Sequence, residues 1–186
     1  TKDNLHASEN VVSLLLTFFS VGIAVGSLLC RKIGGSQVSL KMVPYGAIGL
    51  TLFALYLAGS LAFLPERSGE LIGIYEMFNS GPAYYHVMLS MTLLGISGGF
   101  YIVPLYTMMQ AYAPPSHRAR VVAANNIYNA IFMVASSIFS IIILSLFKID
   151  LKILFCITAV LSAVFSVVLL RQLSFKLATT DQIVEE

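Results

Sequence analysis

Amide side chains inside an apolar segment are the residues of this sequence best placed to do chemistry. Four polar residues share one sector of a helical wheel: Asn125, Asn129, Ser136 and Ser140. An amide in a membrane is costly unless its donors and acceptors find partners, so this stripe faces protein or water. It forms either hydrogen bonds between helices or the wall of a substrate cavity. Three asparagines between Asn125 and Asn129 favour the cavity, and the chemistry is binding rather than catalysis.

The preceding apolar segment carries a second sector of small or polar residues: Thr92, Gly95, Gly99, Tyr106 and Gln110. A tyrosine hydroxyl and a glutamine amide can donate to a polar headgroup. The substrate-cavity candidates are therefore Tyr106, Gln110, Asn125 and Asn129.

A bend is predicted in the same segment. Pro104 removes the backbone donor to the Phe100 carbonyl, and Gly98 and Gly99 loosen the same turn. A bent helix serves alternating access, and a static kink explains the residues equally well.

Catalytic chemistry has little support in this sequence. Ser116 and His117 are adjacent without a nearby acid, so no catalytic group is expected. Cys30 and Cys156 stand in or beside apolar segments, where a free thiol behaves as a small hydrophobe. No disulfide, metal or cofactor is expected, and no basic run is dense enough to suggest nucleic acid.

The composition predicts an all-α integral membrane protein. Hydrophobic residues make up 58% of the chain and charged residues 11%, against about 25% charged in soluble domains. Five apolar segments are about long enough to cross a bilayer as helices: 11–30, 42–64, 87–112, 121–147 and 153–170. They form one bundle over 11–171, between an outer loop at 1–10 and a tail at 172–186. Within the outer loop 65–86, apolar residues at helical spacing predict a surface helix.

Basic residues predict the orientation. Seven of the eleven Lys and Arg residues lie in the loops after the first and third segments or in the tail. Those regions should be cytoplasmic, which puts the N-terminus outside and the C-terminus inside. Arg31, Arg118 and Arg120 could also lock a cytoplasmic gate or bind lipid phosphate, although setting the topology is their commoner use.

The first segment has two faces. Small and hydroxyl residues share one of them: Ser13, Thr17, Ser20, Ala24 and Ser27. Their hydroxyls are expected to bond back to the helix backbone rather than line a cavity. Gly22 and Gly26 lie opposite and allow another helix to approach closely.

Several of these stretches resemble a known family. The loop GSLLCRKIGG partly matches a motif of the major facilitator superfamily, with Gly26, Leu28 and Arg31 in place but Cys30 where the motif has Asp. The stretches GGFYIVPLY, PPSHRARV and AANNIYNAIFMV resemble the lysophospholipid transporter branch of that superfamily. The resemblance implies helices eight to twelve, a partial C-terminal half of a twelve-helix fold. The second and fifth segments lack polar stripes, as expected for the peripheral ninth and twelfth helices.

The resemblance also implies a function. It implies movement of lysophospholipid from the outer to the inner leaflet of the cell inner membrane. The implied partners are this amphiphilic substrate, the lipid bilayer, a missing N-terminal half and an acyltransferase domain in some relatives. Phe100, Ile102 and Phe132 would then flank acyl chains.

Two other functions compete with this one. A proton-coupled exporter of drugs or small metabolites would use acidic or histidine residues in its spans. The five segments hold no acid, and His86 stands at the outer rim of the third. A membrane enzyme or a scaffold without transport is the third class, and the polar stripes and the bend argue against it.

Overall fold

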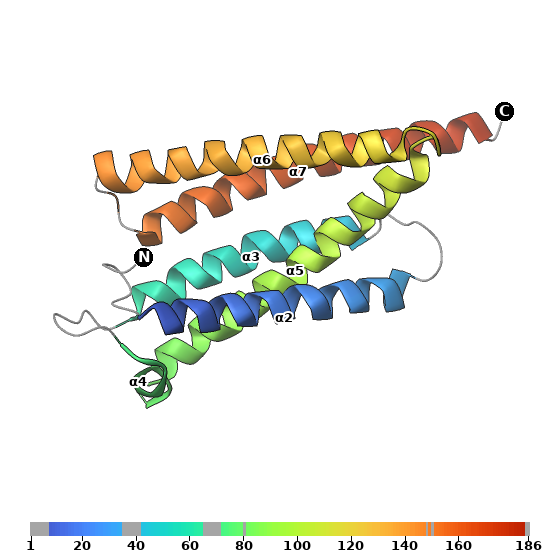
Figure 1. Ribbon diagram of the computed structural model, residues 1–186. Helices are drawn as coiled ribbons and strands as arrows, with labels where there is room; N and C mark the ends of the chain where they lie inside the picture. Colours follow the sequence, from blue (N-terminus) through green and yellow to red (C-terminus); the bar gives the residue numbers. More distant parts are fainter. Residues whose placement is uncertain are drawn as a thin grey trace.

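The computed structural model describes residues 8–34, 42–64, 72–79, 81–147, 149 and 151–184. Over these ranges the elements are helical, in the order α2 (Glu9–Gly34), α3 (Val43–Ala62), α4 (Ile74–Asn79), α5 (Pro82–Tyr112), α6 (Arg118–Ile141), the π-helical turn η2 (Ile142–Leu146) and α7 (Leu151–Val184). Figure 1 shows the long helices running back and forth along one direction, with α5 inclined across α2.

Four of the described helices are long and apolar enough to cross a membrane: α2, α3, α5, and α6 continued through η2. The predicted fifth span, 153–170, falls within α7, whose apolar part Ile153–Val168 is shorter. The chain is therefore an all-helical, multi-pass membrane protein, and the number of five spans stays a prediction. Helix α7 runs on to Val184, so most of the segment predicted as a tail is helical.

Glycine and proline residues set both ends of α5. Gly81 precedes α5 with a φ of 114°, a conformation that glycine adopts without strain, and Pro82 opens the helix. At its other end, Ala113 is extended because it precedes Pro114, which disfavours helical backbone in the residue before it. The short helix α4 lies inside the predicted outer loop, where a surface helix was expected; residues 65–71 of that loop lie outside the described part.

Glycines from α2 and α5 interlock in what we term the glycine seam, formed by Gly22, Gly26, Gly95 and Gly99. A side chain at Gly26 would collide with the Ile96 carbonyl, and one at Gly95 with the Phe19 carbonyl. A Cβ on Gly99 would lie 2.6 Å from the Ser27 backbone nitrogen. The two backbones are thus in direct contact, as the GxxxG spacing of α2 predicts.

The opposite face of α2 behaves as expected. The hydroxyls of Ser13, Thr17, Ser20 and Ser27 each donate to a carbonyl four residues earlier in the same helix, at 2.7 to 2.9 Å. Their bonding capacity is used locally, so this stripe needs neither a ligand nor a neighbouring helix.

The buried core lies at the end of the bundle that holds α4. It joins apolar side chains of α2, α3, α4 and α5 with Ile72: Val11, Leu15, Leu57, Leu61, Met77, Tyr84, Val87 and Met88. Helix α3 also packs against α7 on its other side. Helix α6 differs from all of these because none of its residues is buried.

Candidate functional site

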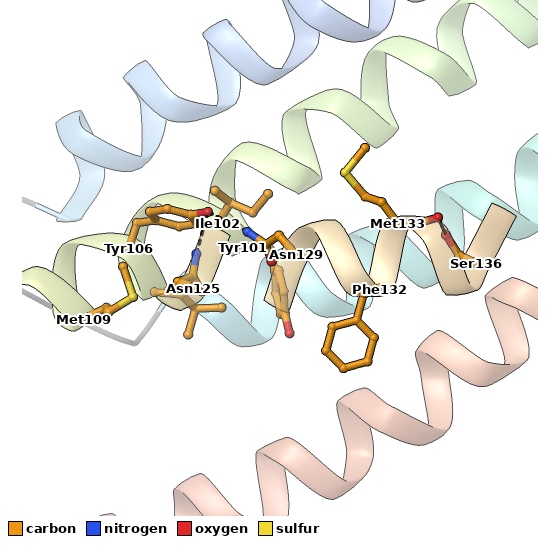
Figure 2. Close-up of a pocket in the computed structure, with 10 residues that line it drawn as sticks. Tyr101, Ile102, Tyr106, Met109, Asn125, Asn129, Phe132, Met133 and Ser136 are labelled. Carbon is orange, nitrogen blue, oxygen red and sulfur yellow. Dashed lines mark hydrogen bonds between the residues drawn. The ribbon is translucent and has the colours of Figure 1, made fainter. Parts of the chain in front are cut away.

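A cavity of about 730 Å³ lies between the second half of α5 and the middle of α6. We term it the α5–α6 cavity. Its polar lining includes Tyr106, Asn125 and Asn129, three of the four residues singled out from the sequence. Figure 2 shows Tyr106, Asn125 and Asn129 close together, with Ile102 beside them and Phe132 and Met133 farther along α6.

The Tyr106 hydroxyl joins the two helices. Asn125 and Asn129 each donate an amide N–H to it, both at 2.9 Å. The two asparagines stand one turn apart on the same face of α6, so both amides can reach the same oxygen. Both bonds that join α6 to this part of α5 therefore meet at one phenol oxygen. We term this arrangement the Tyr106 cluster.

The Tyr106 cluster keeps unused hydrogen-bonding groups. The Tyr106 O–H proton, the second amide N–H of each asparagine and both amide carbonyls have no partner among the described residues. The two bonds that Tyr106 accepts polarise its hydroxyl and strengthen it as a donor. The cluster can therefore donate to a phosphate or hydroxyl oxygen, and its carbonyls can accept from an ammonium group.

Apolar side chains continue the cavity away from the cluster. Ile102 and Phe132 line it, as their phase predicted, but Phe100 does not. Sequence reasoning missed the lining residues Tyr101, Leu105, Met109 and Met133. Met109 could have been predicted, because it lies three residues after Tyr106 and therefore on the same face of the helix.

Gln110 does not belong to this site. It is exposed and does not line the cavity. Its predicted sector also contained Gly95 and Gly99, which face α2 in the glycine seam. Because α5 is inclined across α2 (Figure 1), one stripe of α5 meets different neighbours along its length. A helical wheel carries no information on such an inclination.

The three residues of the predicted bend, Gly98, Gly99 and Pro104, have different surroundings in the structure. Helix α5 is continuous through Pro104, which is buried. Gly99 belongs to the glycine seam, while a side chain at Gly98 would meet open space. The serines of the α6 stripe also differ from the asparagines, because Ser136 and Ser140 donate to backbone carbonyls of their own helix.

The three arginines lie at one end of the bundle, at the C-terminal end of α2 and the start of α6 (Figure 1). Arg118 donates from Nε to the Ala113 carbonyl at 3.2 Å and so ties the start of α6 to the end of α5. Arg31 and Arg120 are exposed. The structure records no contact among the three, and their role in a cytoplasmic gate or in binding lipid phosphate stays a prediction.

No group of three or more His, Cys, Asp or Glu residues that could hold a metal occurs in the part of the chain that the structure describes. Comparison with curated proteins finds no match, and comparison with solved structures finds none either. Comparison with protein-family models matches the Major Facilitator Superfamily over residues 1–182. Long apolar helices, an interhelical cavity with a polar cluster and a match over nearly the whole chain lead to one conclusion: this multi-pass protein belongs to the Major Facilitator Superfamily of membrane transporters.

Proposed function

We propose that this transporter moves lysophospholipid, from the outer to the inner leaflet, with the α5–α6 cavity as part of its path. The observation that supports this cargo is the amphiphilic lining. A polar cluster with free donors and acceptors stands at one end, and Ile102, Phe132 and Met133 continue the wall as apolar surface. A single-chain phospholipid has the same division between headgroup and acyl chain.

The Tyr106 cluster suits a zwitterionic headgroup. The Tyr106 O–H and the free amide N–H groups can donate to phosphate oxygens, and the asparagine carbonyls can accept from an ammonium group. Neutral groups bind such a headgroup without leaving an unpaired charge in the membrane when the site is empty. The cavity is also bounded by α6, none of whose residues is buried, so a lipid can approach sideways.

The test is transport by the full-length protein in proteoliposomes. Inward movement of labelled lysophosphatidylethanolamine is followed beside a cationic dye, with and without a proton gradient. We expect lipid movement in the wild type and about a thirtyfold lower initial rate in the double variant Asn125→Ala/Asn129→Ala, because two headgroup contacts of about 1 kcal/mol each are lost. Asn126→Ala is the matched control, since Asn126 is exposed on the same helix and does not line the cavity.

Two results would contradict the proposal. Unchanged lipid movement in the double variant would remove the Tyr106 cluster as the headgroup site. Gradient-driven dye movement without lipid movement would instead indicate a proton-coupled exporter.

A further inference from the structure

A second cavity, of about 700 Å³, lies between α3 and α5 near the end that holds α4. We term it the α3–α5 groove. Its walls are largely apolar and include Leu55 and Gly59 from α3, Phe63 just after α3 and Pro82 from α5. Phe63 is 83% exposed, so the groove opens toward the surroundings of the helices.

One polar pair stands in this apolar setting. The Tyr56 hydroxyl and His86 Nδ1 are 2.6 Å apart, and the two rings meet edge to face. A neutral imidazole and a phenol have one donor each, and a single hydrogen bond between them uses one of the two. Whichever tautomer His86 adopts, one N–H or O–H donor of the pair has no acceptor among the described residues.

The better-matched arrangement is that Tyr56 donates to Nδ1, because an imidazole nitrogen accepts more strongly than a phenol oxygen. The ring proton of neutral His86 then lies on Nε2. Because His86 is exposed and lines the groove, this N–H is available to a molecule in the groove. A donor without an acceptor is costly in a medium that lacks water.

The depth of the pair indicates what can supply the acceptor. Helix α3 has 20 residues, about 30 Å, which matches the hydrocarbon thickness of a bilayer. Tyr56 lies six residues before its end at Ala62, about 9 Å inside, and His86 lies four residues after Pro82, about 6 Å along α5. The pair therefore lies about 6 to 9 Å inside the ends of these helices, in the leaflet at the α4 end and below the level of its ester groups.

We infer that the α3–α5 groove is a binding site for one glycerophospholipid of the bilayer, held by a hydrogen bond from the Tyr56–His86 pair to an ester or phosphate oxygen. An acyl chain lies along the apolar wall past Gly59. The site belongs to the leaflet opposite the basic ends of α2 and α6, the leaflet that the charge distribution predicts to be outer. It is separate from the α5–α6 cavity, and the inference does not depend on what that cavity transports.

The chain offers well-matched variants. His86→Phe keeps a ring but removes the donor, whereas His86→Gln places an amide N–H near the position of Nε2. Gly59→Leu fills the groove from α3, and a Cβ at Gly59 meets nothing within 4 Å, so the substitution begins in open space.

The experiment uses the full-length protein in nanodiscs of phosphatidylethanolamine and phosphatidylglycerol. A small fraction of the phosphatidylethanolamine carries a diazirine near the ester end of one acyl chain. After irradiation, mass spectrometry measures the label on peptides covering 55–63 and 82–86. Thermal unfolding of each variant verifies that it is folded.

We expect the wild type to be labelled on both peptides. His86→Phe should lower the labelling about fivefold, His86→Gln should retain most of it, and Gly59→Leu should lower it as strongly as His86→Phe. Equal labelling in the wild type, His86→Phe and Gly59→Leu would overturn the inference, because the contact would then be unspecific. Absence of label from both wild-type peptides would also overturn it, since protein rather than lipid would cover the groove. Lysophospholipid transport is not the readout, so failure of the proposed cargo leaves this result unaffected.

Discussion

Helix α5 is bound very differently on its two sides. Toward α2 it forms the glycine seam, where the two backbones touch and a single added carbon would collide with a carbonyl. Toward α6 it leaves a cavity of about 730 Å³ and makes contact through the Tyr106 cluster. One helix therefore combines a close-packed interface with an open, polar one.

The difference teaches where this protein can change shape. Two closely packed backbones have one favourable distance. If the helices move apart they lose contact, and if they move closer their atoms collide. Two hydrogen bonds across a cavity are fewer and weaker, averaging about 0.6 kcal/mol each between membrane helices. Helices α2 and α5 should therefore move together, while α6 can separate from α5 at modest cost.

The largest expected effect comes from breaking the glycine seam. Gly26→Leu would force a side chain into the Ile96 carbonyl, and we expect a loss of about 3 kcal/mol or more in unfolding free energy. Thermal unfolding of the detergent-solubilised protein measures it. Gly98→Leu, which meets open space on α5, should cost less than about 1 kcal/mol. Similar losses in the two variants would show that the seam is not the rigid interface.

A substitution on the side of α5 that faces α6 should have a smaller effect on stability but a large effect on transport. Tyr106→Phe removes the oxygen that accepts from Asn125 and Asn129, at a cost of about 1 kcal/mol in unfolding free energy. If the cluster binds the headgroup, initial rates of lysophosphatidylethanolamine movement should fall about tenfold. Tyr128→Phe, on an exposed tyrosine of α6, is the control. Normal transport in Tyr106→Phe would assign the cluster a purely structural role.

The connection between α5 and α6 gives a third, weaker effect. Arg118→Ala removes the bond from Nε to the Ala113 carbonyl and should lower the unfolding free energy by about 0.5 to 1 kcal/mol. Arg120→Ala, at an exposed position two residues on, should leave it unchanged. Chemical unfolding of both variants under identical conditions distinguishes them, and equal losses would contradict a specific role for Arg118.

The smallest effect is expected at Gln110. Its side chain is exposed and lies outside the cavity lining, so Gln110→Ala should change both stability and transport by less than the error of either assay. A severalfold loss of transport would show that the cavity extends farther toward the end of α5 than the structure indicates.

Hydrophobic segment length predicted the long helices well, because the backbone in lipid must satisfy its own hydrogen bonds. The GxxxG spacing of Gly22 and Gly26 predicted a close helix approach, and the structure identifies α5 as the neighbour. The partners of Asn125 and Asn129 could not be read from one helix, because the Tyr106 oxygen stands 19 and 23 residues away on another. Gln110 shares the helical phase of Tyr106 but does not line the cavity, and a helical wheel could not predict this because it shows one helix without its neighbours.

The bond between Arg118 and Ala113 has a mechanical consequence. It fastens the start of α6 to the end of α5, while the rest of α6 carries no buried side chain. Together with η2 the helix has 29 residues, a lever of about 43 Å. A tilt of about 5° around the fastened end would carry the far end of the lever by about 4 Å, given that length. A small tilt of α6 about its Arg118 end therefore becomes a sideways displacement of several ångströms at the η2 end.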